Sequence, residues 1–309
     1  MRKSVKIVSV LSTCVVLALA LLLVGCGSSS STGTSKASST ASTAQASNEF
    51  KTNGPKAISP KASEVNSADA DGVLTVGFDQ EFPPYGYVGN DGTFAGVDLE
   101  LAAEVAARNG WDLNCVPINW DGKDNELNSG AIDCIWNGFT MEGREDGYAF
   151  TEPYMNNTQV VVVKKDSGIN SLSDLAGKVV LTQADSAAYN LLTGDGDQVS
   201  LASTFGALQT VADYNSAFME LEQGSVDAVA IDQPVVNFQI SGKEDTYVIL
   251  SEPLSTEHFA VGFATSNTAE RDAVQKTLKE MTADGAAKQI VDKYADQGTN
   301  WDAWCLSAN

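Results

Sequence analysis

Alternating strands and helices occur twice along this chain, and this repetition constrains the fold more than any other feature. In the first set, strands are predicted at residues 72–78, 112–118 and 131–138, with a helix and a shorter helical segment between them. Asp98 is the expected N-cap of the first helix, and Asn109-Gly110 is its expected stop. Strands that alternate with helices at this spacing predict a parallel, doubly wound sheet and therefore an α/β fold.

A second α/β set follows Thr158. It has predicted strands at 159–165, 178–182, 207–212 and 226–232, helices at 183–192 and 215–224, and a capped helical turn at 171–177. One more strand is predicted at 258–265, followed by two helices that we expect to return to the first unit. Ligands of open α/β sheets bind at the carboxyl ends of strands, where Phe78-Asp79 and Asn137-Gly138 lie.

The first 25 residues have the pattern of a secretory signal peptide. Arg2, Lys3 and Lys6 precede an apolar stretch at 8–24, and "LVGC" ends at Cys26. This ending resembles a bacterial lipobox, which implies that Cys26 is lipidated and tethers the protein to the membrane outside the cytoplasm. The alternative is a retained membrane-spanning anchor, because about 17 apolar residues is the lower edge of a spanning length. The Ser/Gly run after Cys26 favours the lipobox.

Residues 26–70 are rich in Ser, Thr, Ala and Lys and predict a flexible tether. The formal charge of −21 becomes −24 once the three signal-peptide cations are removed. Nucleic acid is therefore not an expected partner. The acidity is a solubility feature that modestly attracts cationic solutes.

Cys115, Cys134 and Cys305 remain beyond the signal and the lipid site. Export permits a disulfide, three pairings are open, and one thiol is left over in each. Cys134 lies in an apolar run, so a buried core residue is at least as good an interpretation as a bridge. The cysteines lack metal-ligand spacing, and we expect no metal and no cofactor.

Six segments together resemble the polar amino-acid group of extracellular solute-binding proteins, the capture subunits of ABC importers. They are "LTVGFDQEFPPYGY", "FAGVDLELAAEVA", "GAIDCIWNGFTMEGREDGYAFTEPY", "LSDLAGKVVLTQADSAA", "LEQGSVDAVAIDQPV" and "MTADGAAKQIVDKY". The resemblance covers residues 72–296 and rests on all six occurring in the family's order.

The resemblance implies the two-lobed, type II periplasmic-binding-protein-like fold. Lobe 1 would comprise residues 71–160 and 258–309, and lobe 2 residues 161–257, joined by crossover strands near 160–164 and 258–264. A free amino acid would bind between the lobes, and the closed protein would dock on an ABC permease. The expected protein is a monomer at the cell surface or in the periplasm, and not an enzyme.

The resemblance also assigns the two charged groups of the ligand. Arg144 matches the arginine that grips the α-carboxylate, and a guanidinium fork suits that group. It follows Thr140 by one residue fewer than in many relatives. Ser186 opens a helix, so its hydroxyl and the nearby N–H groups would share the carboxylate. Asp232 matches the aspartate for the α-ammonium, helped by Thr140 and a carbonyl at Asn137 or Gly138.

Side-chain recognition is assigned to three further residues. Phe82 and Trp120 match the aromatic pair that sandwiches the ligand side chain. Asp79 matches a side-chain-reading position and indicates a polar or cationic ligand. Asp185 stands where relatives often have a small residue. Trp136 is expected in the core, because it alternates with Asn137 along a strand.

Each of these residues also has a purely structural interpretation. Arg144 would be a surface residue paired with a glutamate, and Ser186 and Asp232 would be ordinary helix caps. His258, the only histidine, is expected at a crossover or on the surface. "TGDGDQ" (193–198) lacks the later ligands of a calcium loop.

Two other functional classes stay open. A dehydratase acting on cyclic dicarboxylates would need a general acid in the cleft, for which Glu81 is the candidate. A ligand-sensing input module would need a signalling partner.

Overall fold

The computed structural model describes residues 54–58 and 71–309. The predicted signal peptide, Cys26 and most of the predicted tether lie outside the described residues. Gly54 lies beside Leu113 and Cys115. In the described ranges, no helix has both the length and the apolar character needed to cross a membrane.

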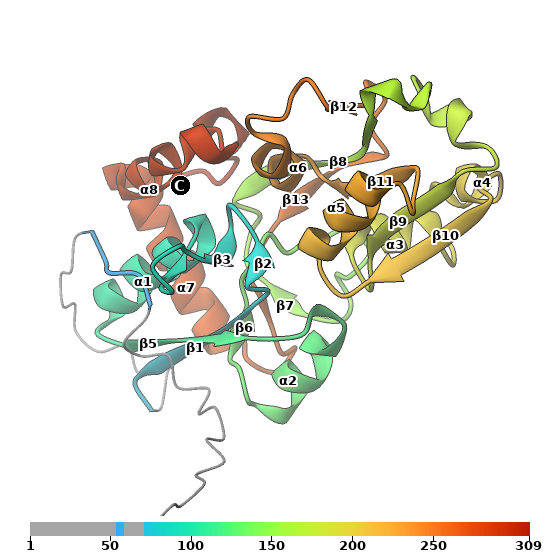
Figure 1. Cartoon of the computed structure of the whole chain (residues 1–309). Coiled ribbons are helices and arrows are strands. Elements are labelled where there is room, and N and C mark those ends of the chain that lie inside the picture. Colours follow the sequence, from blue (N-terminus) through green and yellow to red (C-terminus); the bar gives the residue numbers. More distant parts are fainter. Residues whose placement is uncertain (1–53, 59–70) are drawn as a thin grey trace, which may run out of the picture. The chain divides into compact units, whose positions relative to one another are not determined.

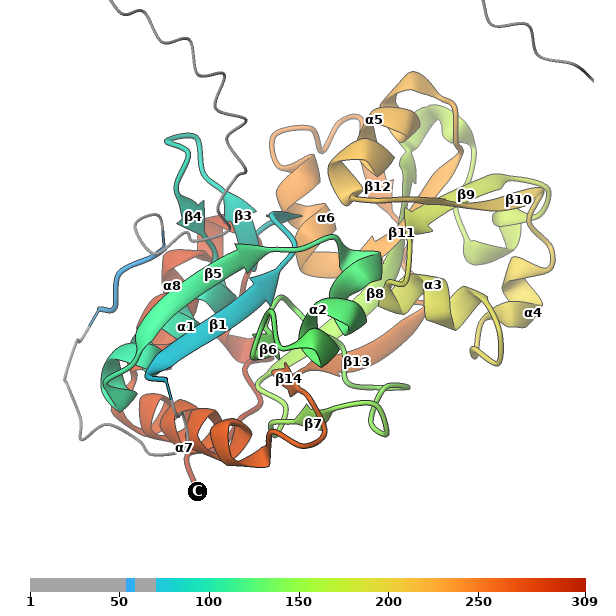
Figure 2. The ribbon, with the colours of Figure 1, turned by 90° about the horizontal axis from the view of Figure 1, so that it is seen from below.

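The first sheet has five strands in the order β5-β1-β6-β14-β7, all labelled in Figure 2, which views the ribbon of Figure 1 from below. Strand β1 pairs in parallel with β5 and β6, as the alternating pattern predicted, whereas β14 pairs antiparallel with β6 and β7. The strands are β1 (Val73–Phe78), β5 (Asp112–Pro117), β6 (Cys134–Ile135), β7 (Ala149–Phe150) and β14 (Gly262–Phe263). β6 is shorter than predicted, because the chain turns away at Gly138, which has a φ of 56°.

Helices cover both faces of this sheet. Leu74, Val76 and Phe78 are fully buried in one apolar cluster with residues of α1 (Val97–Asn109) and α7 (Thr268–Asp284). Ile135 packs on the other face with Leu127 of α2 (Lys123–Ser129). Figure 2 shows α2 and α1 on opposite sides of β1. Strands buried on both faces explain the nearly continuous apolar run at residues 72–78.

The predicted cap of α1 is wrong. The helix begins at Val97 after Gly96, where a side chain would collide with the carbonyl of Tyr85, and no side chain caps it. Asp98 is instead fully buried and accepts hydrogen bonds from the Gly138 N–H (2.5 Å) and the Tyr154 hydroxyl (2.8 Å). It therefore ties α1 to the loop after β6. The predicted stop at Gly110 is confirmed by its left-handed conformation.

The turn-rich segment between β1 and α1 forms a small three-stranded sheet. It contains β2 (Glu81–Phe82), β3 (Gly86–Val88) and β4 (Phe94–Ala95), all antiparallel. Tyr85, between β2 and β3, is buried and packs edge-on against Phe259 at 5.0 Å. This packing fixes the position of the neighbouring Phe82.

The second sheet has the order β10-β9-β11-β8-β12 and is mixed, because β9, β10 and β11 run parallel while β8 is antiparallel to β11 and β12. Its strands are β8 (Met155–Lys164), β9 (Val179–Gln183), β10 (Ala207–Val211), β11 (Ala228–Asp232) and β12 (Tyr247–Ile249). Its helices are α3 (Ala187–Leu192), α4 (Val199–Ala202), α5 (Tyr214–Gln223) and α6 (Gln233–Ile240). α6 was expected only through the alternative role of Asp232 as a helix cap. Asp232 is the N-cap residue of α6 but makes no side-chain capping hydrogen bond, and a proline lies in the first turn, a position that proline favours.

Two strand segments link the sheets. β13 (Ser255–Phe259) pairs antiparallel with the first half of β8, from Ser255 opposite Gln159 to Phe259 opposite Met155. The crossover strands predicted near 160–164 and 258–264 are thus placed a few residues too late. The predicted positions were based on apolar runs. Those runs lie in the cores of the two sheets, and the residues that link the sheets are more polar.

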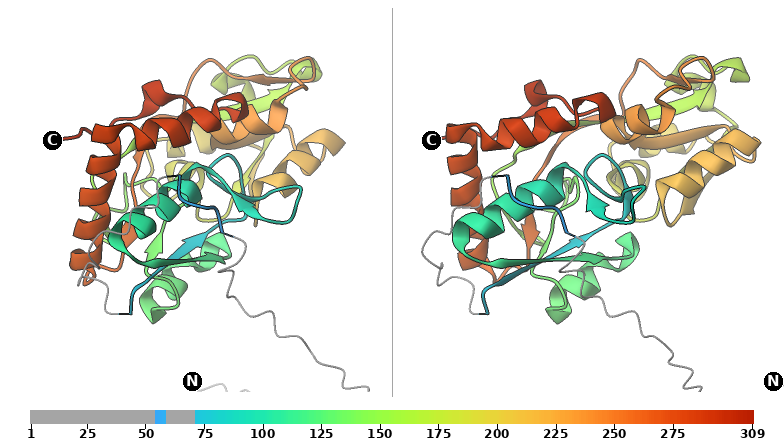
Figure 3. Two further views of the ribbon diagram at one scale, coloured as in Figure 1. Left: turned by 90° about the vertical axis from the view of Figure 1, so that its left-hand side faces the viewer. Right: turned by 60° about the vertical axis from the view of Figure 1, so that its left-hand side comes forward.

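The chain returns to the first sheet at β14, and the helices that follow pack on the first unit, as expected. α7 and α8 (Ala286–Lys293) pack against α1 (Figure 3). Short 3-10 turns follow at Ala295–Gln297 and Trp301–Ala303, and Trp304 bridges to Met155 at the start of β8.

The three described cysteines are free thiols. Cys115 and Cys134 both lie opposite Val76, on its two neighbouring strands. Two strand spacings of about 4.8 Å separate them, which is beyond disulfide reach. Both are buried, as the core interpretation of Cys134 predicted, and Cys305 is exposed.

Candidate functional site

A narrow cavity lies where the ends of the strands of the two sheets meet. Its lining comprises Phe82, Trp120, Asn137, Gly138, Thr140, Arg144, Gln183, Ser186, Ala187 and Asp232. Eight of these are sequence-predicted site residues, and Gln183 and Ala187 are additional. The cavity volume is about 10 Å³, roughly the space of one water molecule.

The loop after β6 carries Arg144 into this cavity. The Arg144 N–H donates to the Met141 carbonyl, which closes a tight turn and brings the guanidinium over the ring of Phe139 at 5.1 Å. Its two terminal nitrogens donate to the carbonyls of Thr140 (3.1 Å) and Asp185 (3.0 Å). A guanidinium has five N–H groups, so others remain for a carboxylate. The shorter spacing from Thr140 still places this side chain in the cavity wall.

Ser186 faces Arg144 from the second sheet. It is the N-cap of α3, and its hydroxyl accepts a hydrogen bond from the Tyr189 N–H at 3.1 Å. The capping interpretation is thereby confirmed, and the side chain also lines the cavity. Ser186 is therefore placed to contribute a second polar group beside the guanidinium.

Asp185 points its carboxylate away from the cavity. It has a φ of 55° and forms an ion pair with the buried ammonium of Lys123, the first residue of α2. Its carbonyl accepts hydrogen bonds from Arg144 and from the indole of Trp120 (3.2 Å). Burial lowers the pKa of Lys123, and Asp185 opposes that shift. The extra negative charge is thus neutralised outside the cavity.

Asp232, at the end of β11, forms part of a buried carboxylate pair with Glu257 of β13. The side-chain amides of Asn157 and Gln159 each donate to both carboxylates, at 2.6 to 2.8 Å. Burial raises the pKa of Asp232 to about 8, with a further contribution from Glu257. The pair has no cation partner among the described residues.

Sequence reasoning missed Glu257. The predicted strand began one residue later, at His258, so the glutamate fell outside every pattern. Its alternation with Ser255 and Phe259 along one strand is the signal that could have found it. Thr140 donates its hydroxyl to Glu257 at 2.7 Å.

Asp79 is buried but does not line the cavity. It accepts hydrogen bonds from the Gln183 amide (2.6 Å) and from the Glu81 N–H (2.8 Å), and burial raises its pKa to about 6. Gln183 itself lines the cavity. Gln183 is therefore the group at the wall, with Asp79 hydrogen-bonded to it.

The aromatic residues divide as expected between cavity and core. Phe82 lies 6.0 Å from Tyr214, and Trp120 packs edge-on against Phe139 at 5.6 Å. Trp136 is fully buried next to Tyr154 in the main apolar cluster. The amide of Asn137 is also buried, and neither of its polar atoms has a hydrogen-bond partner among the described residues.

The remaining candidates lie outside the cavity. His258 is half-exposed in β13 with its ring nitrogen 2.5 Å from Glu142. Glu81 lies in a separate groove at the edge of the two sheets, hydrogen-bonded to Asn215. In residues 54–58 and 71–309, no three His, Cys, Asp or Glu side chains are grouped to hold a metal ion.

Comparison with known proteins places this geometry in context. Residues 74–297 match the family described as bacterial extracellular solute-binding proteins, family 3. The L-cystine-binding protein TcyA of Bacillus subtilis is 32% identical over 229 residues, covering 72% of this chain and 81% of that protein. The L-cystine-binding protein TcyJ of Escherichia coli is 27% identical over 233 residues, covering 74% and 85%.

A solved structure agrees in fold. The substrate-binding protein of an ABC uptake transporter from Streptococcus pneumoniae, with bound histidine, superimposes with a TM-score of 0.68 at 30% identity. The match covers 75% of this chain and 96% of that one. The α/β type II fold predicted from the sequence is confirmed.

Proposed function

This chain belongs to the bacterial extracellular solute-binding proteins, family 3, and we propose that it captures one L-amino acid with a polar or charged side chain and delivers it to an ABC permease. Its relatives include proteins that bind cystine and histidine. Such a capture protein performs no covalent chemistry.

One observation carries the proposal: groups suited to both charges of an amino acid line the same cavity. Arg144 and Ser186 offer donors for the α-carboxylate, and Asp232 offers an acceptor for the α-ammonium. Charge-assisted hydrogen bonds of this kind are stronger than neutral ones. A carbonyl at Asn137 or Gly138 and the hydroxyl of Thr140 would complete the ammonium site. The side chain would lie between Phe82 and Trp120.

Binding requires movement, because an amino acid is much larger than a cavity of about 10 Å³. We assign residues 71–160 and 258–309 to lobe 1 and residues 161–257 to lobe 2. The paired segments of β8 and β13 would act as the hinge, and the lobes would part, admit the ligand and close again. The closed form would then dock on the permease.

The protein would work as a monomer outside the cytoplasm. The sequence pattern at Cys26 supports lipid attachment, and residues 26–70 would hold the lobes away from the bilayer. Mass spectrometry of the membrane fraction tests this: an intact Cys26→Ala chain should lose the lipid mass and its membrane retention.

The enzyme alternative depends on Glu81 as a general acid. This carboxylate lines a groove that does not include Arg144 or Asp232. A turnover assay with cyclic dicarboxylates would support this alternative if Glu81→Gln abolished a measured activity.

Titration calorimetry against the standard amino acids and cystine tests the capture function. We expect one or a few amino acids to bind the unmodified protein, and we expect Arg144→Ala to weaken binding at least about 100-fold, because it removes a charge-assisted bidentate contact. Arg271→Ala is the matched control, since Arg271 lies in α7 and contacts Asp272 and Phe150. Equal binding by Arg144→Ala and the control would overturn the assignment.

A further inference from the structure

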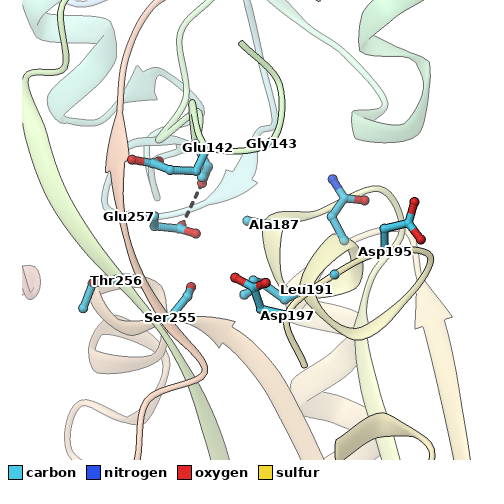
Figure 4. A pocket seen from close by; sticks show the side chains of 12 residues that line it. Glu142, Gly143, Ala187, Leu191, Asp195, Asp197, Ser255, Thr256 and Glu257 are labelled. Atoms are coloured by element: carbon cyan, nitrogen blue, oxygen red, sulfur yellow. Dashed lines mark hydrogen bonds between the residues drawn. The ribbon is translucent and has the colours of Figure 1, made fainter. Parts of the chain in front are cut away.

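A wider cavity adjoins the narrow one. Its volume is about 320 Å³, and Thr140 and Ala187 line both cavities. Its wall comprises Thr140, Glu142, Gly143, Ala187, Asn190, Leu191, Asp195, Gly196, Asp197, Ser255, Thr256 and Glu257. In Figure 4 this space lies between β13, the loop that carries Glu142, and α3 with the turn that follows it.

The wall carries four carboxylates and no lysine or arginine. The Glu142 carboxylate accepts a hydrogen bond from the His258 backbone N–H, and its other oxygen lies next to the His258 ring nitrogen. Asp195 and Asp197 are exposed, so water screens their charges. These three residues give the cavity a negative potential without forming a specific site.

Glu257 differs from the other three carboxylates because it is only 4% exposed. Its Oε1 accepts hydrogen bonds from Thr140, Asn157 and Gln159, but its Oε2 has no hydrogen-bond or ion-pair partner among the described residues. Figure 4 shows this carboxylate directed from β13 into the cavity. Buried carboxylates are usually paired with cations, so the missing cation points to a ligand.

Glu257 and Asp232 stand close together but face different cavities. Each accepts a hydrogen bond from the same nitrogen of Asn157 at 2.7 Å, so the two bonded oxygens are at most about 5.4 Å apart. Asp232 lines the narrow cavity and Glu257 the wide one. Two neighbouring buried carboxylates do not both ionise without compensating cations, and a ligand with two cationic groups supplies one for each.

The alternative position for a cationic side chain is less accessible. Asp79 is already hydrogen-bonded to Gln183 and does not line the narrow cavity. The wide cavity offers space, a free carboxylate oxygen, and an apolar wall from Ala187 and Leu191 for a methylene stem. A metal ion fits less well, because the described acidic groups are not clustered at coordinating distances.

We propose that the wide cavity is a second subsite for the same ligand, in which Glu257 binds a cationic group, so that the protein selects amino acids bearing two cationic groups. The side chain would leave the Phe82 and Trp120 pair beside Thr140 and Ala187, which line both cavities, and its terminal ammonium or guanidinium would lie against Glu257. This inference rests on the proposed capture function and adds the chemical class of the cargo.

Matched ligands provide the test by calorimetry. Arginine and citrulline have nearly the same shape but differ in charge, and lysine and norleucine differ by the terminal ammonium. We expect the unmodified protein to prefer the cationic member of at least one pair by about 10-fold or more. The arginine and citrulline pair tests recognition of a guanidinium, and the lysine and norleucine pair tests recognition of an ammonium.

Three variants locate the source of that preference. Glu257→Gln keeps an acceptor for Thr140, Asn157 and Gln159 but removes the charge, and we expect the preference to fall about 10-fold. Glu280→Gln, on the exposed face of α7, makes the same charge change far from the cavities and should keep the preference. Asp79→Asn should also keep it.

The outcomes are distinct. If Asp79→Asn removes the preference and Glu257→Gln keeps it, or if the unmodified protein binds an amino acid but prefers neither cationic member, the second subsite is wrong. If no amino acid binds at all, the capture function itself fails.

Discussion

At the residue scale, the site depends on carboxylates that the fold buries without cations. Asp232, Glu257 and Asp98 are each at most 4% exposed, and their partners are amides, hydroxyls and backbone N–H groups. Neutral donors satisfy the oxygens geometrically but leave the charge uncompensated. The ligand-free protein therefore favours the protonated forms of Asp232 and Asp98, and a cationic ligand against Asp232 favours its ionised form.

This charge balance predicts a pH dependence of stability. The pKa of Asp232 is about 8 in the folded protein, against an ordinary value of 3.8, and that of Asp98 is about 7. Between pH 4 and 8 the folded state thus binds more protons than the unfolded state, so the free energy of unfolding should fall as the pH rises. Urea denaturation of the ligand-free protein at pH 5, 6, 7 and 8 measures this. Asp232→Asn should flatten the dependence near pH 7 to 8; an identical slope in the variant would contradict the assignment.

Three residues that the sequence predicted for the ligand site lie together in the narrow cavity wall. Asp232 ends a strand and Ser186 precedes a helix, so residue type and position together marked them, whereas Arg144 lies in a loop and was marked by the family resemblance. Glu257 lies opposite Asn157 in a short polar strand, and Gln159, which donates a hydrogen bond to it, is 98 residues away in sequence. Alternation along the strand could have marked Glu257 as buried, but no local pattern indicates these distant partners. Asp79 lies at the end of a strand, as predicted. Its hydrogen bond from Gln183 joins residues of the two sheets, and no pattern in the sequence indicated that contact.

At the element scale, the cavity is shaped by the close approach of β3 to the loop after β6. Gly86 packs against Asn137 and Phe78, and an added Cβ would lie 2.3 Å from Asn137 Oδ1 and 2.8 Å from Phe78. Glycine is required here because there is no room for a Cβ atom, and not because of the backbone conformation. The buried amide of Asn137 is held in the cavity wall by this contact.

We therefore expect Gly86→Ala to lower the free energy of unfolding by about 1 to 3 kcal/mol, the usual cost of overpacking. Because Asn137 must shift, amino-acid affinity should fall as well. Gly122→Ala is the matched control: its backbone is right-handed and no atom lies within 4 Å of an added Cβ. Urea denaturation and calorimetry of both variants measure the two effects. If the two variants had similar free energies of unfolding, the loop after β6 would be able to shift without cost, and the prediction would be wrong.

Element prediction failed where context overrides the local pattern. Asp98 occupies a position typical of an N-cap, yet Gly96 starts the helix because the chain passes too close to Tyr85 for a side chain there. The start of α6 was considered only as a helix that Asp232 would cap, because its apolar residues follow Asp232 directly, without a turn between strand and helix. Both failures concern element ends, where tertiary contacts decide.

At the scale of the whole molecule, two α/β sheets share two antiparallel segments and bring their strand ends together at one cavity. Alternation of strands and helices predicted the sheets, and the return of α7 and α8 to α1 followed from the order of elements. The position of the linking segments could not be predicted, because these strands contain polar residues and lack the apolar pattern that marks a strand in a sheet core. The charges of the cavity come from both sheets, which is why closure and binding are coupled in the proposed mechanism.

The central claim is that Arg144 and Asp232 hold the two charges of one amino acid. The most direct measurement is calorimetry of the unmodified protein with its best amino acid, with the carboxamide of that amino acid, and with its N-acetyl derivative. We expect each derivative to bind at least about 100-fold more weakly, because each leaves one charged partner unpaired in a closed cavity. If either derivative bound as tightly as the free amino acid, the corresponding charge would not be recognised and the account of the site would be wrong.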